Sequence, residues 1–118
     1  MKENLIKIKS FAFALRIIKM YKYLASEKKE FVISKQVLRS GTSIGANIEE
    51  ADSGQSKKDF IAKMSISLKE AKETHYWLRL LHLSDFISID MFDSIIVDCE
   101  EIIAILTTII KTARKNVE

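Results

Sequence analysis

Proline is absent from this chain of 118 residues, and glycine occurs only three times. Sheet-rich folds need many tight turns, which proline and glycine usually supply. Their scarcity therefore predicts an all-α fold built from long helices. The single cysteine, Cys99, excludes an internal disulfide and any metal site made of several cysteines. Because it lies in an isoleucine-rich stretch, we interpret it as a small buried hydrophobic residue in a reducing compartment.

Long hydrophobic runs are also missing. The most apolar stretch, residues 95–110, contains Asp98, Glu100 and Glu101, whereas a membrane-spanning helix needs about 18 apolar residues in succession. The first ten residues alternate charged with apolar side chains and lack the apolar segment of a signal peptide. We therefore expect a cytoplasmic protein with no membrane partner.

Hydrophobic residues make up 47% of the chain and charged residues 30%, which is typical of one soluble domain, here residues 1–118. Short polar segments divide the domain into four amphipathic helices. We expect these helices at about residues 4–25, 34–52, 57–83 and 89–115. Since the connections are short, sequential helices should pack as an antiparallel up-down-up-down four-helix bundle.

Serines and a glycine mark the expected helix ends. Ser34, Ser56 and Ser88 each precede an apolar-periodic segment, where a serine side chain caps a helix by accepting a backbone hydrogen bond. Gly54 follows the second helix, and glycine is common at helix C-termini.

The second helix also contains internal glycines, Gly41 and Gly45. Each costs about 1 kcal/mol relative to alanine, so we expect them to allow a close approach of another helix. In an antiparallel hairpin this places Gly41 near Ala71 and Ser43 near Ser67. A phosphate-binding loop is the alternative, but the segment lacks the required lysine spacing and a preceding strand.

The first helix carries two apolar rows. At about 100° per residue these rows point in nearly opposite directions. One core can bury only one of them, and the other must contact a partner, because large exposed apolar surfaces usually mark interfaces. The sequence leaves open which row faces the core. One row is Ile6, Phe13, Ile17, Met20 and Leu24, and the other is Ile8, Phe11, Leu15 and Ile18.

Isoleucines at seven-residue spacing broaden the apolar face of the fourth helix. We combine them with the second row of the first helix into a predicted subunit interface. The alternative is an unusually wide core in a monomer. The predicted interface residues are Ile8, Phe11, Leu15, Ile18, Ile96, Ile103 and Ile110.

Several charged residues of the second and third helices are candidates for chemistry. Glu50, Glu70 and Glu73 could serve as a general acid–base group. The antiparallel register, however, places Arg39 beside Glu70 and Glu73, and partnered charges are tolerated where lone charges are not. We therefore interpret Arg39, Asn47, Glu50, Glu70 and Glu73 as a structural polar network and predict no enzymatic activity.

No metal or cofactor is predicted. Di-iron helix bundles use a Glu-x-x-His pattern on two helices, whereas Lys72 and Arg79 stand three residues before His75 and His82. Cys99 lies in an apolar run without an activating base, so it is not a candidate nucleophile.

Charge is distributed unevenly although the net charge is only +3. Residues 1–26 carry six basic side chains and one acidic one, whereas residues 84–118 carry three basic and seven acidic ones. Basic rows on helices can bind RNA or DNA backbones in a sequence-independent, salt-sensitive way. The alternative is a protein–protein interaction scaffold with no nucleic-acid binding. The candidate nucleic-acid contacts are Lys9, Arg16 and Lys19 on the first helix and Lys57, Lys72 and Arg79 on the third.

Two segments resemble a known bacterial family. They are Arg39–Ala51, with Ser43, Ile44, Asn47, Ile48 and Glu50, and Ser56–Leu81, with Ser56, Phe60, Glu70, Glu73, Thr74, Trp77 and Leu78. This pattern resembles the four-helix-bundle proteins encoded in intervening sequences of 23S rRNA genes, also called the S23 ribosomal protein family. Many relatives have glycine where this chain has Ala51.

The resemblance implies a ring-like homopentamer of four-helix bundles without established enzymatic activity. A related branch, the accessory variability determinants of diversity-generating retroelements, binds nucleic acid and a reverse transcriptase through a basic surface. The resemblance thus implies self-association and adds nucleic acid as a candidate partner.

Overall fold

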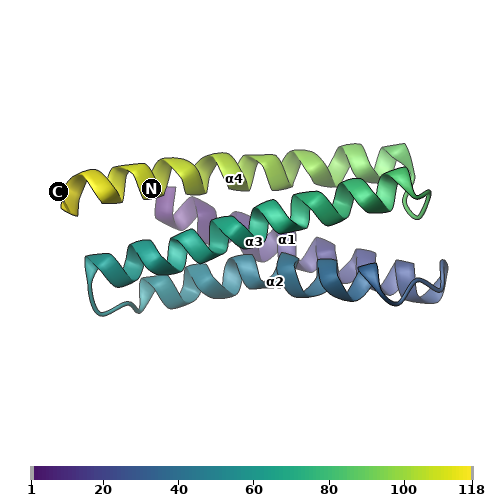
Figure 1. The fold of residues 1–118 in the computed structure, drawn as a ribbon, viewed down its shortest axis with the longest axis horizontal. Helices are drawn as coiled ribbons and strands as arrows, with labels where there is room; N and C mark the ends of the chain where they lie inside the picture. Colours follow the sequence, from purple (N-terminus) through teal and green to yellow (C-terminus); the bar gives the residue numbers. More distant parts are fainter. Residues whose placement is uncertain (1, 118) are drawn as a thin grey trace.

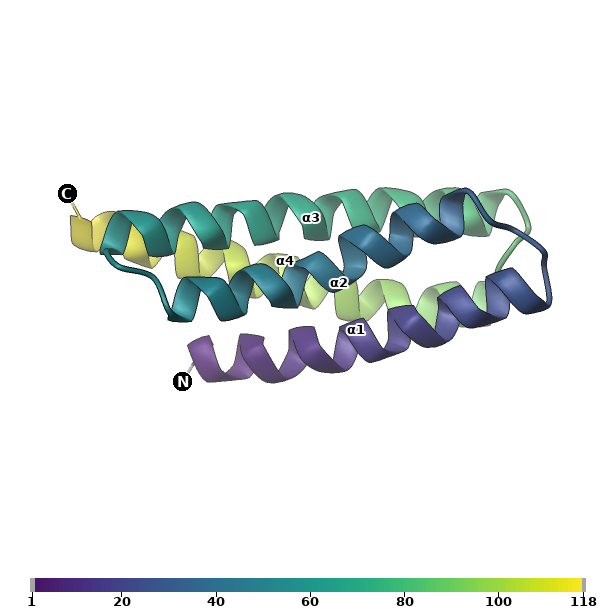
Figure 2. The same ribbon diagram turned by 90° about the horizontal axis from the view of Figure 1, so that it is seen from below.

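The structure is a computed structural model that describes residues 2–117, with side chains from residue 4 onward. It contains four helices, and no strand occurs within residues 2–117. Consecutive helices run in opposite directions along a body of 48 × 21 × 19 Å (Figures 1 and 2). The helices are α1 (Lys2–Ser26), α2 (Ile33–Asp52), α3 (Lys57–Leu83) and α4 (Ile89–Val117).

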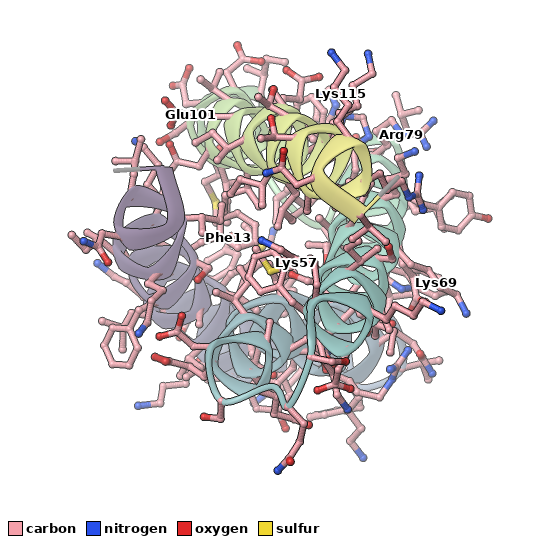
Figure 3. All side chains as sticks on the ribbon, turned by 90° about the vertical axis from the view of Figure 1, so that its left-hand side faces the viewer. Phe13, Lys57, Lys69, Arg79, Glu101 and Lys115 are labelled. Atoms are coloured by element: carbon pink, nitrogen blue, oxygen red, sulfur yellow. The ribbon has the colours of Figure 1, made fainter. Side chains whose placement is uncertain are left out.

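Each helix contacts two others. α1 packs on α2 and α4, and α3 packs on the same two helices from the opposite corner. Seen end-on, the four helices therefore surround one core, into which Phe13 points (Figure 3). None of the helices in residues 2–117 has a stretch apolar and long enough to cross a lipid bilayer.

The structure decides which apolar row of α1 faces the core. Phe13 is 1% exposed, and the other members of its row are buried with it. These are Ile6, Ile17, Met20 and Leu24. The second row lies on the outside of the bundle.

The expectation for α4 needs a correction. Ile96 and Ile110 are 8% and 4% exposed, so they belong to the core of the single chain and cannot contribute to a subunit interface. Ile103 is half-buried and packs against the same core. The apolar face of α4 is wide because this helix covers both α1 and α3.

The start of α2 differs from its prediction. Ser34 is not the cap: it lies inside the helix, fully buried, and its hydroxyl donates to the Glu30 carbonyl at 2.8 Å. The Glu30 carboxylate caps the helix instead. It accepts hydrogen bonds from the backbone N–H groups of Val32, Ile33 and Ser34 at 3.1, 3.0 and 2.6 Å. A carboxylate is favourable here because the helix N-terminus carries a partial positive charge.

The starts of α3 and α4 agree with the caps predicted from the sequence. Ser56 caps α3 by accepting the Asp59 N–H at 3.1 Å, and Ser88 accepts the Met91 N–H at 3.2 Å at the start of α4. Gly54 follows α2 without a positive φ. A Cβ atom there would lie 2.8 Å from the movable Asp59 Oδ2 and 3.0 Å from the Ala51 carbonyl oxygen, so a side chain at this position would crowd the turn.

The internal glycines of α2 face a different helix from the one expected. A Cβ atom on Gly41 would lie 2.8 Å from Ile17 Cγ1, and one on Gly45 would lie 3.3 Å from Ser10 Oγ. Both neighbours belong to α1, so these glycines allow a close approach of α1 rather than of α3, and the pairing of Gly41 with Ala71 stays a prediction. Ser67 does contact α2, but its hydroxyl donates to the Ile44 carbonyl at 2.8 Å rather than meeting Ser43.

Candidate functional site

The outer row of α1 forms the largest apolar feature on the surface of this helix. Ile8, Phe11 and Leu15 are 69%, 67% and 56% exposed. Ile18, from the same row, is half-buried and lines a groove of about 410 Å³ between α1 and α2 together with Phe11 and Leu15. We call Ile8, Phe11, Leu15 and Ile18 the α1 apolar face.

A charged rim flanks this groove on the α2 side. Lys7 Nζ lies 2.6 Å from Asp52 Oδ2 and 3.6 Å from Glu49 Oε2. The hydrogen bond to Asp52 and the charges of Asp52 and Glu49 raise the pKa of Lys7 above its ordinary value. The rim therefore tethers α1 to the end of α2 and borders an apolar surface with polar residues, as at the edges of many protein interfaces.

The basic row of α1 is largely neutralised within the chain. Lys9 Nζ lies 2.8 Å from Glu101 Oε1, and Arg16 Nη1 lies 2.6 Å from Asp98 Oδ2. Arg16 also donates to the Ser94 hydroxyl at 2.7 Å. Lys9 and Arg16 therefore do not present free charges, because acidic residues of α4 pair with them, whereas nucleic-acid binding by this row stays a prediction. Lys19 lines an α1–α4 groove that also includes Asp90.

On α3, Lys72 and Arg79 are exposed and share one side of the helix with Lys69. Figure 3 shows Lys69 and Arg79 projecting from the side of the bundle opposite α1. The Arg79 guanidinium carbon lies 5.7 Å from the centre of the Tyr76 ring, and Tyr76 is 47% exposed. We call Lys69, Lys72, Tyr76 and Arg79 the α3 basic row.

The remaining predicted basic residue, Lys57, lies at the start of α3. It lines a separate cavity of about 420 Å³ at the end of the bundle, with Phe60 and Ala113. Fifteen positions separate it from Lys72, which is about 22 Å along a helix. The structure therefore does not bring Lys57 into one contact surface with Lys72 and Arg79.

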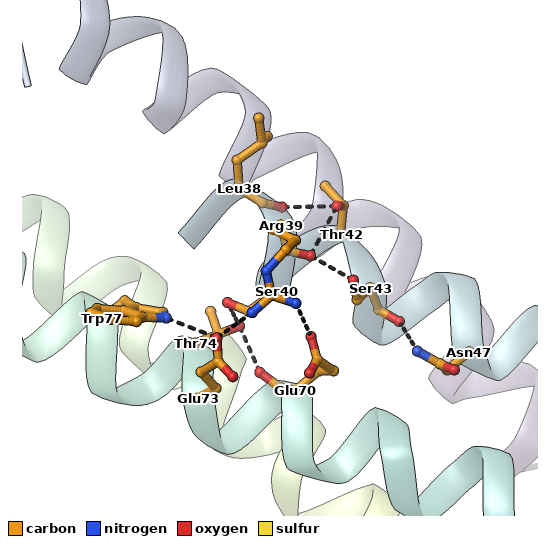
Figure 4. Close-up of polar contacts among 10 residues, drawn as sticks. All are labelled: Leu38, Arg39, Ser40, Thr42, Ser43, Asn47, Glu70, Glu73, Thr74 and Trp77. Atoms are coloured by element: carbon orange, nitrogen blue, oxygen red, sulfur yellow. Dashed lines mark hydrogen bonds and ion pairs between the residues drawn. The ribbon is translucent and has the colours of Figure 1, made fainter. Parts of the chain in front are cut away.

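The polar network between α2 and α3 is centred on Arg39 (Figure 4). Its guanidinium lies 3.3 Å from Glu70 Oε2 and 2.7 Å from Glu73 Oε2. Glu73 Oε2 also accepts a hydrogen bond from the indole N–H of Trp77 at 3.1 Å. Beneath these groups, the buried hydroxyls of Ser40 and Thr74 lie 2.8 Å apart.

Two predicted members are not part of this network. Asn47 donates to the Ser43 carbonyl one turn earlier in its own helix at 2.8 Å, and Glu50 pairs with Lys63 at 3.3 Å. Both residues lie more than two turns beyond Arg39 along α2, too far for a shared contact. The network therefore links α2 to α3 at one level and fixes their register there. Ser40 and Trp77 complete the network.

The cysteine and histidine side chains, which have catalytic potential, are buried or paired with neighbouring residues. Cys99 is buried, and its thiol donates to the Ala71 carbonyl at 3.4 Å. Burial, with the nearby charges of Glu100 and Asp98, raises the pKa of the Cys99 thiol to about 12, so the thiol is neutral at pH 7. His75 pairs with Glu100 at 3.1 Å. Within residues 2–117, no three metal-ligating side chains gather into one group.

Comparisons with known proteins agree with the fold. The family model described as 23S rRNA-intervening sequence protein matches residues 2–108. A solved protein of unknown function from the S23 ribosomal protein family of Bacteroides thetaiotaomicron is 56% identical to this chain. The two structures superpose with a TM-score of 0.93 over 94% of this chain and 99% of the other. A comparison with curated proteins gives no match.

Proposed function

We propose that this chain, which belongs to the 23S rRNA-intervening sequence protein family, is a non-enzymatic building block of a ring-like cytoplasmic homopentamer. The α1 apolar face carries this proposal, because three of its large side chains are more than half exposed in a single copy. Soluble proteins rarely leave such a row in contact with water. Covering it in an interface is favourable by about 25 cal/mol for each Å² of apolar surface removed from water. The resemblance to the family supports five copies of an antiparallel bundle.

The oligomeric state of a Leu15→Glu variant tests the proposal. Leu15 is 56% exposed, so a carboxylate there stays hydrated in the free monomer and the fold is retained. In the assembly the same carboxylate becomes buried without a partner, which costs several kcal/mol. We expect the wild type to sediment as an oligomer and Leu15→Glu as a folded monomer.

The matched control is Ile66→Glu on α3. Ile66 is 43% exposed and lies outside the α1 apolar face, so this variant should assemble like the wild type. Circular dichroism establishes that each variant is folded. A wild type that sediments as a single copy at high concentration, or a Leu15→Glu variant that assembles normally, contradicts the proposal.

The surroundings of the reactive groups support a non-enzymatic role. The neutral, buried Cys99 thiol is not a nucleophile. Arg39 binds both Glu70 and Glu73, which gives these two residues a structural role rather than that of a free acid–base pair.

We propose RNA or DNA binding as a second function, located on the α3 basic row. The specific observation is an exposed aromatic ring among unpaired cations. Lys69, Lys72 and Arg79 form no ion pair with any side chain the structure describes, and Tyr76 lies between them. Lysine and arginine bind phosphates, and an exposed aromatic ring stacks on bases. A ring assembly repeats this row in every copy and multiplies the basic surface.

Reversing two charges of the α3 basic row tests nucleic-acid binding. Lys72→Glu combined with Arg79→Glu should weaken binding to single-stranded RNA by at least about tenfold at low ionic strength. The slope of the logarithm of affinity against the logarithm of salt concentration should fall by the amount expected for about two lost phosphate contacts. Fluorescence anisotropy with a labelled oligonucleotide across a salt series measures both effects.

The control carries the same charge change elsewhere: Lys57→Glu combined with Lys58→Glu, both exposed at the start of α3 and at least about 16 Å along the helix from every residue of the α3 basic row. Equal loss in both double variants would show a nonspecific effect of net charge. An assembled wild type without any salt-dependent binding would leave a protein–protein interaction scaffold as the function.

A further inference from the structure

We infer that the α1 apolar face of one copy binds the outward face of α4 in the next copy, head to tail. This inference rests on the proposed self-assembly and identifies the surface that receives α1. The outward face of α4 has Val97, which is 60% exposed, and Ala104, also exposed, with Asp90 and Asp93 closer to the start of the helix. We call these four residues the α4 outer face.

Ion pairs within one chain fix the relative levels of α1 and α4 along the bundle. Lys9 lies beside Glu101, and Arg16 lies beside Asp98 and Ser94. Residue numbers rise along α1 as they fall along α4 in these contacts. Continuing this register, Ile8 is level with Ala104 and Leu15 is level with Val97.

The same register holds between copies in a ring whose axis runs parallel to the helices. Rotation about an axis parallel to the helices moves no residue along that axis, so α1 of one copy meets α4 of the next at the levels already set within the chain. Ile8 and Leu15 then face Ala104 and Val97. The large Ile8 meets the small Ala104, and Leu15 meets the apolar Val97, so the side chains of the two helices can interdigitate.

Charge is complementary along the rest of the contact. The outside of α1 changes from apolar to basic at Lys19 and Lys22, and both are exposed. In the register above, Lys19 is level with Asp93 and Lys22 with Asp90. None of these four forms an ion pair with a side chain that the structure describes within its own chain. A neighbouring copy pairs them, while Glu101, level with Phe11, is already held by Lys9.

The positions of the two faces favour a closed ring. Viewed end-on, α1 and α4 occupy neighbouring corners of the bundle (Figure 3). Neighbouring corners of a four-helix bundle face directions about 90° apart. Joining such faces head to tail rotates each copy by a similar angle relative to the last, so the contact closes after about four or five copies instead of extending into a filament.

Mixing two assembly-defective variants tests the inference. Leu15→Glu spoils the α1 apolar face but keeps the α4 outer face, and Val97→Glu does the reverse. Each variant alone should be monomeric or far less assembled than the wild type. Mixed in equal amounts, they retain one good contact, between α1 of Val97→Glu and α4 of Leu15→Glu. We expect a complex of two copies, twice the chain mass of 13.5 kDa, in light scattering after size-exclusion chromatography.

The outcomes separate the two claims. A wild type that is monomeric overturns the proposed self-assembly. An assembled wild type with a Val97→Glu variant that also assembles normally keeps self-assembly but overturns this inference, because α1 then binds another surface such as its own copy. Two folded monomeric variants that form no mixed dimer also overturn it. Because Val97 is 60% exposed, the variant should fold, and circular dichroism checks this.

Discussion

A Glu30→Ala variant should lose about 2–3 kcal/mol of unfolding free energy at pH 7, although Glu30 lies outside any helix. Its carboxylate accepts three backbone hydrogen bonds at the start of α2, and the residue is only 9% exposed. Alanine leaves the buried Ser34 N–H and the part-buried Val32 and Ile33 N–H groups without this partner. Chemical denaturation followed by the fluorescence of Trp77 measures the loss.

The effect should depend on pH in a defined direction. Burial alone would raise the pKa of Glu30, but the hydrogen bonds from Ile33, Ser34 and Val32 lower it below its ordinary value of 4.5. A group with a lowered pKa stabilises the fold above its unfolded-state pKa, and this contribution is lost as the pH falls through the folded-state pKa. The difference between wild type and Glu30→Ala should therefore be largest above pH 4.5 and shrink below it.

Glu27→Ala is the matched control, because Glu27 is an exposed carboxylate on the same connection. This change should alter stability by less than about 0.5 kcal/mol at any pH. A Glu30→Ala variant as stable as the control at pH 7, or a difference that grows toward acid pH, would contradict the role of Glu30 as the cap.

The sequence predicted the helices well because their signals are local. Hydrophobic periodicity and the serines before α3 and α4 depend only on neighbouring residues, and Ser56 and Ser88 cap as expected. Glu30 was missed because a cap four residues before Ser34 requires the connecting chain to fold back over the helix end. That conformation includes a positive φ of 53° at Lys29, which no residue type in the segment signals.

Contacts between helices were predictable only where charge selected the partner. Arg39 has opposite charges on α3 at its own level, so its pairing with Glu70 and Glu73 follows from an antiparallel register. Gly41 carries no such information, since a small residue fits any close neighbour, and the structure places it against Ile17. Lys9 and Arg16 on α1 are the opposite case. Their charges are visible in the sequence, but the acidic residues that pair with them lie more than 80 positions away.

Replacing two phenylalanines of α1 should separate folding from assembly. Phe13 is 1% exposed and Phe11 is 67% exposed, although they lie two positions apart. Phe13→Ala leaves a cavity in the core of the bundle, and such a truncation costs about 3–5 kcal/mol. Because a domain of this size is stable by only about 5–15 kcal/mol, we expect a strongly lowered denaturation midpoint.

Phe11→Ala should do the opposite. The exposed ring contributes little to the fold of one copy, so in a monomeric Leu15→Glu background the substitution should change the unfolding free energy by less than about 0.5 kcal/mol. In the assembling wild-type background it removes a large aromatic side chain from the proposed contact, and we expect the dissociation constant to rise by at least about tenfold, since interface aromatics often contribute more than 1.4 kcal/mol. Denaturation and sedimentation of the same samples measure both quantities. If both substitutions destabilise the monomer equally, the two apolar rows of α1 are not divided between the core and a partner. Self-assembly through the outer row of α1 would then be contradicted.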